Sequence, residues 1–176
     1  MKNSPTASTT PYGSQIASRL PGAYFHDAWA IRATEPNLTA LEQFLRVARK
    51  TPAWIDRLMT LRNHIVGLFG LKNLGGIAQI DPNKKASDYQ AGDPVGIFTL
   101  ISNTPNEVLL GDSDQHLNVV VSVHKQSNLA EEDTTITVTT VVHVHNWLGR
   151  LYMIPVTPAH KVIARAMVRA LGDEIG

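Results

Sequence analysis

Two stretches in the second half of the chain decide its fold: Leu117-Asn-Val-Val-Val-Ser-Val123 and Thr134-Thr-Ile-Thr-Val-Thr-Thr-Val-Val-His-Val144. Both are rich in β-branched residues, which favour strands. In both, apolar residues recur at every second position, so each strand has one apolar face. With a turn between residues 125 and 133, the two stretches predict a long antiparallel hairpin.

The same two-residue period begins at Val95, so the pattern extends toward the N-terminus. Together with the turn at 125–133, turns at Asn103 to Asn106 and at Asp112 to Gln115 divide residues 95 to 145 into four strands of an antiparallel meander. A slip of one residue would invert a strand, so agreement across the four strands indicates which face is apolar. That face is predicted to hold Ile97, Thr99, Ile101, Val108, Leu110, Leu117, Val119, Val121, Val123, Ile136, Val138, Thr140, Val142 and Val144.

Other elements flank the meander. Ala23 to Ala33 alternates as a strand, with Phe25, Asp27, Trp29 and Ile31 on one face. A capping box from Thr39 to Glu42 predicts a helix over residues 38–50, and a second helix is predicted over 52–69. Thr157-Pro158 predicts the start of a last helix that ends near Leu171. The predicted core contains residues of the second helix, the sheet and the last helix. These residues are Trp54, Leu58, Leu61, Ile65, Val119, Val121, Val138 and Met167.

This order of elements predicts an α+β fold. We expect a helix-grip domain over residues 21–176, in which a curved antiparallel sheet wraps around a long C-terminal helix and a two-helix segment follows the first strand. Residues 1–20 are rich in Ser, Thr and Pro, so we expect a flexible tail there.

The composition argues against several classes of function. The chain has 16 Lys and Arg against 15 Asp and Glu, so its formal net charge of +1 gives no overall attraction to nucleic acid or an anionic membrane. It has no cysteine, which excludes disulfides and thiolate metal sites. No stretch reaches the roughly 18 apolar residues of a spanning helix. The first residues lack the apolar core of a signal peptide, so we expect a cytoplasmic protein.

Two longer blocks indicate a family. The first block is Trp54-Ile-Asp-Arg-Leu-Met-Thr-Leu-Arg-Asn-His-Ile-Val-Gly-Leu-Phe-Gly-Leu-Lys72, and the second block is His145-Asn-Trp-Leu-Gly-Arg-Leu-Tyr-Met-Ile-Pro-Val-Thr-Pro-Ala-His160. They resemble the signature blocks of the bacterial Domain of Unknown Function 2867 family, over about Pro21 to Leu171. The element order resembles the helix-grip (START-like, SRPBCC) superfamily. These resemblances imply the architecture but no catalytic residues or cofactor, and apolar ligand binding follows only by analogy with the superfamily.

The last helix suggests a binding site, because its inward positions are mostly small. Ala159, Ala166 and Ala170 alternate with Ile163 and Met167 opposite an apolar sheet. This pattern predicts either an elongated cavity for an apolar molecule or close packing, for which alanine is equally suited. The candidate ligand-binding residues are Asp27, Trp29, Arg62, Thr99, Val119, Val121, Val138, Thr140, Ile163, Ala166, Met167 and Ala170.

Asp27 shares its strand face with apolar residues, and Arg62 lies on the apolar flank of the second helix. We expect them to form an ion pair, because either charge buried alone would be costly. Such a pair would be a charged anchor or general base in the pocket, or, as we favour, a structural link between strand and helix.

Three histidines are the remaining candidate group. His143 and His145 share one face of their strand, and the expected register places His116 opposite His143 with Asp114 nearby. Such a group would suit zinc. A solvent-facing sheet surface is equally an ordinary place for histidine, so we assign no metal and no cofactor.

The leading functional hypothesis is a domain that binds a small apolar or lipid-like molecule without evident catalytic machinery. One alternative is an enzyme that uses the same cavity with Asp27 and Arg62. Another is an interaction protein, such as a homodimer, that associates through an outward sheet patch. The residues expected in that patch are Phe98, Leu100, Leu109, Val120 and Val141.

Overall fold

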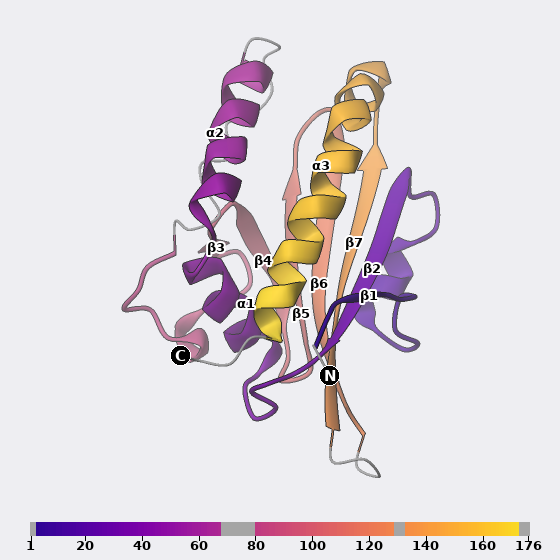
Figure 1. Cartoon of the computed structure of the whole chain (residues 1–176). Helices are drawn as coiled ribbons and strands as arrows, with labels where there is room; N and C mark the ends of the chain where they lie inside the picture. Colours follow the sequence, from indigo (N-terminus) through magenta and orange to yellow (C-terminus); the bar gives the residue numbers. More distant parts are fainter. Residues whose placement is uncertain (1–2, 68–79, 129–132, 173–176) are drawn as a thin grey trace.

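A computed structural model describes residues 3–67, 80–128 and 133–172, with side chains in the first range described up to residue 60. In these ranges an antiparallel sheet forms one layer, and a long helix lies across its inner face (Figure 1). The sheet order is β1-β2-β7-β6-β5-β4-β3. The strands are β1 (Thr6–Ala7), β2 (Phe25–Arg32), β3 (Pro94–Val95), β4 (Phe98–Asn103), β5 (Glu107–Ser113), β6 (Leu117–Asn128) and β7 (Asp133–Val144).

The helices gather on the inner face of the sheet. They are α1 (Ala40–Arg49), α2 (Ala53–Gly67) and α3 (Trp147–Leu171). The chain also forms two short 3-10 turns, η1 (Gln15–Arg19) and η2 (Ala86–Asp88), of which η1 lies on the outer face. The predicted capping box opens α1: Thr39 accepts a hydrogen bond from the Glu42 backbone, and the Glu42 carboxylate accepts one from the Thr39 backbone. Helix α1 packs against α3, β5 and β6, whereas α3 packs against β2 and β7. The predicted α+β architecture is therefore confirmed.

The register confirms which face of the central strands points toward the helices. Direct cross-strand partners on this inner face run through Asp27, Thr140, Val121, Leu110 and Leu100. One row of side chains thus crosses β2, β7, β6, β5 and β4, as the two-residue period requires.

Strand β4 departs from the prediction. A register shift between Leu100 and Ser102 leaves Ile101 without a direct partner on β5, so the face of the strand changes at a β-bulge. Leu100 is buried on the inner face, whereas Thr99 pairs with Gly111 and is exposed. Thr99 and Leu100 were therefore each predicted on the wrong face. The prediction aligned the strands by the positions of their turns, and these positions do not reveal a bulge within a strand.

Helix α3 begins eleven residues earlier than predicted, at Trp147 instead of Pro158. Asn146 is its N-cap, and its side chain accepts a hydrogen bond from Gly149 N at 3.0 Å. The helix continues through Pro155 and Pro158. Pro158, which the sequence suggested as the first residue, is an interior residue with no backbone N–H to donate.

In helix α2, two residues that were predicted to be buried are partly exposed. Ile55 is fully buried, whereas Trp54 and Leu58 are 40% and 39% exposed. All three are apolar neighbours on a wide face, so the hydrophobic pattern left the rotation of the helix ambiguous. The side chains of Leu61, Arg62 and Ile65, and the predicted helix end at Phe69, lie outside the described residues.

The N-terminal segment, expected to be a flexible tail, contacts the sheet at particular residues. Ile16 of η1 is fully buried against Leu109, Val120 and Val141 on the outer face of the sheet. Two backbone N–H groups of η1, from Gln15 and Ile16, donate to the buried Glu107 carboxylate at 2.7 and 3.3 Å. The burial of Ile16 and these hydrogen bonds offset the polar composition of the segment.

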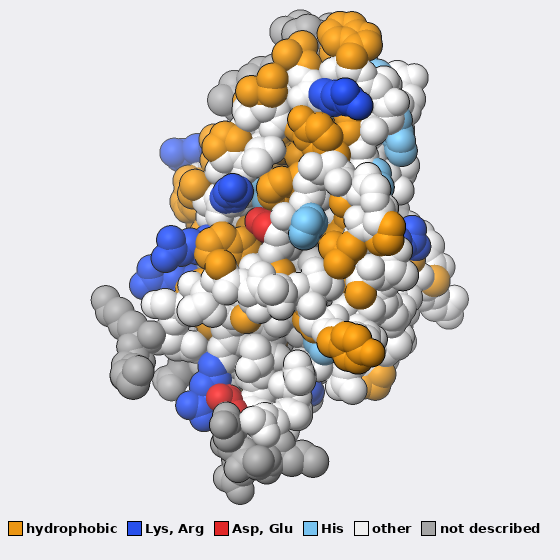
Figure 2. Space-filling view, turned by 90° about the vertical axis from the view of Figure 1, so that its right-hand side faces the viewer, with side chains coloured by type: hydrophobic (Ala, Val, Ile, Leu, Met, Phe, Trp, Pro, Cys, Tyr) orange, Lys and Arg blue, Asp and Glu red, His pale blue; other side chains and the backbone are white. Residues whose placement is uncertain are grey.

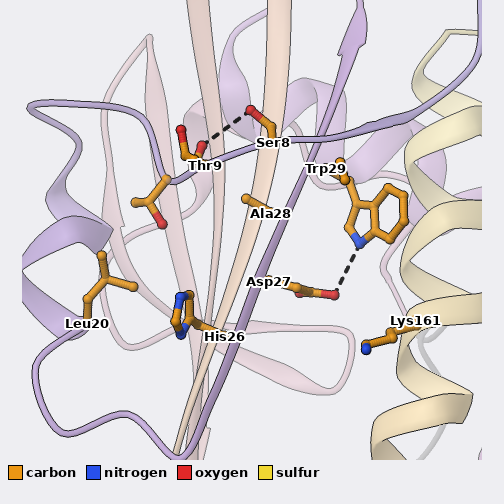
Figure 3. A pocket seen from close by; sticks show the side chains of 10 residues that line it. Ser8, Thr9, Leu20, His26, Asp27, Ala28, Trp29 and Lys161 are labelled. Carbon is orange, nitrogen blue, oxygen red and sulfur yellow. Dashed lines mark hydrogen bonds between the residues drawn. The ribbon is translucent and has the colours of Figure 1, made fainter.

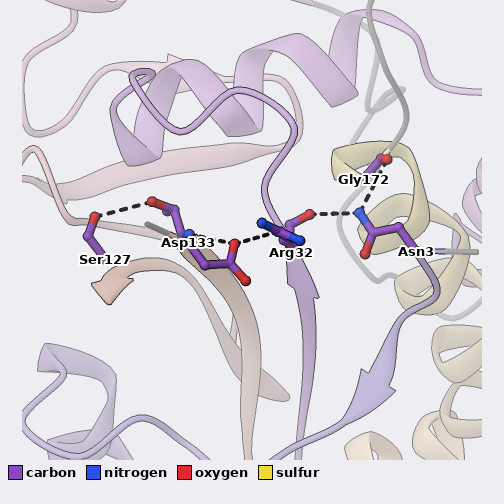
Figure 4. A network of polar contacts seen from close by, with 6 residues as sticks. Asn3, Arg32, Ser127, Asp133 and Gly172 are labelled. Atoms are coloured by element: carbon purple, nitrogen blue, oxygen red, sulfur yellow. Dashed lines mark hydrogen bonds and ion pairs between the residues drawn. The ribbon is translucent and has the colours of Figure 1, made fainter. Parts of the chain in front are cut away.

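Contacts at the start of the chain add to this packing (Figure 4). The Asn3 side chain donates to the backbone oxygen of Arg32 at 2.9 Å and to that of Gly172 at 3.4 Å, which links the N-terminal segment to the end of α3. Beside it, Arg32 forms an ion pair with Asp133 at 2.6 Å.

These contacts change the interpretation of the outer face. Leu109, Val120 and Val141 are covered by the chain's own N-terminal segment, and Phe98 and Leu100 belong to the inner core. The outward apolar patch expected for self-association is therefore not exposed. Among the described residues, no helix is both long enough and apolar enough to cross a bilayer.

Candidate functional site

A cavity of about 450 Å³ lies between the inner face of the sheet and α3. Its volume falls in the range of small-molecule pockets. Helices α1 and α2 supply part of its wall through Phe44, Val47, Leu58 and Met59. The polar or hydroxyl-bearing side chains among the described lining residues are Asp112, Asp114, Thr140, Tyr152 and His160.

The sheet wall of the cavity is built by strand alternation. Strands β6 and β7 each contribute every second residue, and nearly all of these are valines. Val119, Val121 and Val138 were predicted to be buried core residues, but they are only half-buried in the middle of the sheet. These three valines border the cavity. Val123 also borders it, but packs in the core cluster that contains α1 and is only 2% exposed.

Helix α3 provides the opposite wall with one face. In the first half of α3 the lining residues belong to the second block and include Tyr152, Met153 and Val156. These residues lie before the predicted helix start at Pro158, but they are helical because α3 starts at Trp147. Ala159, Ile163 and Met167 also line the cavity, as their predicted inward positions imply. Ala166 and Ala170 pack against the core cluster and do not line the cavity.

The start of α3 is fixed by a close backbone approach. A Cβ atom added to Gly149 would lie 2.5 Å from the His116 backbone oxygen and 2.8 Å from Val144. The Asn146 side chain also lies within hydrogen-bond distance of the His116 ring, and the His145 backbone donates to the His116 oxygen at 2.8 Å. The second block therefore docks the helix on the β5–β6 turn.

His160 is the partner of Asp27 in the structure. Its Nε2 lies 3.2 Å from Asp27 Oδ1, and the indole N–H of Trp29 donates to Asp27 Oδ2 at 3.1 Å. Phe25 contacts the His160 ring edge-on, with 5.6 Å between ring centroids. Because His160 lines the main cavity and also contacts Asp27, the pair couples α3 to β2 at the cavity wall.

The surroundings of Asp27 stabilise its charged form. Burial alone would raise the pKa of its carboxyl group, but the hydrogen bond and charge of His160, the hydrogen bond from Trp29 and the charge of Lys161 outweigh this effect. The pKa is lowered below the ordinary value of 3.8. Asp27 is therefore an ionised, hydrogen-bonded group at neutral pH.

A second pocket, of about 420 Å³, lies on the other side of this pair at the β2 edge (Figure 3). It is lined by Asp27, Trp29, His26, Lys161 and the segment that follows β1. In Figure 3, Lys161 reaches from α3 toward Asp27 and the Trp29 ring stands beside the helix. Asp27 and Trp29 were predicted to line the main cavity but line this edge pocket instead. The contact between Asp27 and His160 lies between the edge pocket and the main cavity.

The structure places the predicted site residues in different surroundings. Val119, Val121, Val138, Thr140, Ile163 and Met167 line the main cavity. Asp27 and Trp29 line the edge pocket, whereas Ala166 and Ala170 pack in the core and Thr99 faces outward. The Arg62 side chain lies outside the described residues, so its expected ion pair with Asp27 is not tested.

Sequence reasoning missed His160 as a site residue. Its position between Ala159 and Ile163 puts it near the inward face of the last helix, and this spacing was visible in the sequence. The prediction considered only the small and apolar positions of the last helix as cavity wall, so the polar His160 beside Ala159 was not included.

The predicted histidine group is dispersed. His143 pairs with Asn118, not His116, and its ring contacts the Pro21 oxygen. His116 instead contacts Asn146 and Gln115. Over the described residues, no three His, Asp or Glu side chains come close enough to hold a metal ion.

Comparison with known proteins gives one result. The family model described as "Protein of unknown function (DUF2867)" matches residues 19–167, which include the whole second block and nearly every lining residue of the cavity. Searches of curated proteins and of solved structures returned no match.

Proposed function

Because the chain belongs to the family described as a protein of unknown function (DUF2867), we propose its function from the cavity itself: it binds a small, mainly apolar molecule between the sheet and α3. The proposal rests on the half-buried valines in the centre of the sheet. Burying their exposed surface against a ligand would stabilise the complex by roughly 25 cal/mol per Å². The element order also supports a place for the family in the helix-grip superfamily.

His160 is the proposed polar contact for the ligand. It lines the cavity and its ring is oriented by the ionised Asp27. Its Nε2 lies 3.2 Å from Asp27 Oδ1, so Nδ1 is the ring nitrogen we propose for the ligand contact. A single hydroxyl or amide group on an otherwise apolar ligand would satisfy it, and Thr140 offers a further hydroxyl on the sheet wall.

Mass spectrometry provides the test of this function. Freshly purified protein is measured under native conditions and again after denaturation. We expect a native mass above that of the chain by a few hundred daltons, which is released on denaturation. Native protein at the bare chain mass, together with no thermal stabilisation by a panel of fatty acids, sterols and aromatic metabolites, would refute the proposal.

An enzyme is the second candidate, and the Asp27–His160 pair is the observation that favours it. A carboxylate that orients an imidazole is a common arrangement for a general base. The released ligand distinguishes the two functions. A ligand whose mass is unchanged after incubation with fresh protein supports binding alone, and conversion to a different mass supports catalysis.

A further inference from the structure

The outward face of α3 carries an exposed apolar stripe. Trp147, Leu151, Ile154 and Val162 are 73%, 51%, 68% and 61% exposed. Their spacings of four, three and eight residues put them on one side of the helix. The cavity-lining residues of α3, such as Val156 and Ile163, occupy the opposite side. Single exposed apolar residues are ordinary, but a row of four on one helix face indicates a contact surface.

The charges of α3 are of one sign. The helix contains Arg150, Lys161, Arg165 and Arg169 and no Asp or Glu. The net charge of +1 for the whole chain conceals this uneven distribution. Figure 2, which views the molecule from the β2 side, shows hydrophobic side chains exposed in its upper half with Lys and Arg side chains among them.

We propose that this face of α3 docks on the surface of an anionic lipid bilayer. Apolar side chains that include a tryptophan, with basic residues and no acidic ones, fit the interface between acyl chains and negative headgroups. Each Lys or Arg near such a surface contributes about 1 kcal/mol. The helix would lie in the plane of the interface, because it does not cross the bilayer.

A second copy of the chain fits this face less well. Two α3 helices packed through their stripes would bring eight basic groups together without an acidic group from either helix, since each contributes four. Like charges in contact cost several kcal/mol across an interface. Charge therefore favours an anionic surface as the partner.

This inference goes beyond the proposed function and stands on different residues. If both hold, α3 has one face on the bilayer and the other on the bound molecule, so an apolar ligand could pass between the two with little exposure to water. Vesicle binding and ligand binding are measured separately, so either can fail alone.

The experiment is co-sedimentation with vesicles at low ionic strength. Wild-type protein is mixed with vesicles of phosphatidylcholine alone or with 30% phosphatidylglycerol, and compared with the double variant Trp147→Glu/Ile154→Glu. Tyr12→Glu is the matched control, because Tyr12 is fully exposed but lies far from α3 in the sequence. Thermal unfolding establishes that all three proteins fold.

We expect wild type and Tyr12→Glu to bind the anionic vesicles, with binding reduced by 0.5 M salt. The double variant should bind at least tenfold more weakly, because it loses two apolar contacts and adds two negative charges. No sedimentation of the wild type with anionic vesicles would overturn the proposal, as would equal binding by the double variant. A wild-type dimer in solution that the double variant dissociates would also overturn it and assign the stripe to self-association.

Discussion

Nε2 of His160 lies 3.2 Å from Oδ1 of Asp27, and this contact joins the last helix to the first long strand across 133 positions of the sequence. The side chains are only 25% and 14% exposed, so neither group is well solvated if its partner is removed. The Asp27–His160 pair therefore holds α3 against β2 and also forms part of the wall of the candidate site.

A double-mutant cycle tests this coupling. Asp27→Asn and His160→Gln should each lower the free energy of unfolding by about 1–3 kcal/mol, and the double variant should lose less than the sum. Urea unfolding provides the measurement. His26→Gln, an exposed neighbour on the same strand, should change stability by less than about 0.5 kcal/mol. Strict additivity of the two single effects would show that the residues do not interact.

The contribution of Asp27 should depend on pH in one direction. Because its pKa is lowered in the folded state, Asp27 stabilises the fold above its ordinary pKa of 3.8. This contribution is lost as the pH falls from about 3.8 through the lower folded value. The stability difference between wild type and Asp27→Asn should therefore be full at pH 7 and shrink between pH 4 and pH 2.

Urea unfolding of both proteins over this pH range checks the prediction. Hydrogen bonds from the backbone and side chain of Thr39 also lower the pKa of Glu42, so acid destabilises both proteins by this second route. The difference between them removes that shared effect. A difference that stays constant down to pH 2 would mean that Asp27 is not selectively stabilised in its charged form.

Gly149→Ala tests the docking of α3 on the β5–β6 turn. Alanine normally favours a helix over glycine by about 1 kcal/mol. Here its Cβ would lie 2.5 Å from the His116 backbone oxygen, so we expect the variant to lose about 1–3 kcal/mol of stability instead. Thermal unfolding measures the change, and Arg150→Ala at the next, exposed position is the control. A stabilised Gly149→Ala protein would contradict the close approach.

Ile16→Ala tests the packing of the N-terminal segment. Ile16 is fully buried on the outer face of the sheet, so the substitution should cost about 2–5 kcal/mol through lost burial and a cavity. Tyr12→Ala, in the same segment but fully exposed, should have almost no effect. Chemical unfolding distinguishes the two. Equal stability of Ile16→Ala and wild type would restore the flexible tail expected from composition.

The sequence predicted much of the fold because its strongest signal is local. Alternation in β6 and β7 established which residues face inward, and it correctly put Val121 and Thr140 on one face. The capping box at Thr39 located the start of α1. These features depend on neighbours two to four residues apart, so a single chain displays them fully.

The errors share a different cause, since each depends on contacts between distant segments. The bulge at Ile101 changes the face of Thr99, but only the pairing with β5 reveals it. Pro158 looks like a helix start until Asn146 is seen to cap α3 against His116. His160 was missed as the partner of Asp27 for the same reason.

The cavity that we propose as the site for an apolar molecule lies next to Val121, and one pair of substitutions tests whether it is open. Val121 faces the cavity and is half-buried, whereas its neighbour Val120 is 3% exposed beneath Ile16. Val121→Phe should fill empty space and keep its stability, and Val120→Phe should lose about 1–3 kcal/mol by overpacking.

The decisive measurement is a fluorescence titration of wild type and Val121→Phe with 1-aminoanthracene, an uncharged apolar probe, with Thr99→Val as a control on the outer face. We predict saturable binding by wild type and by Thr99→Val, and at least tenfold weaker binding by a stably folded Val121→Phe. Equal binding by Val121→Phe, or no saturable binding by wild type, would contradict the account.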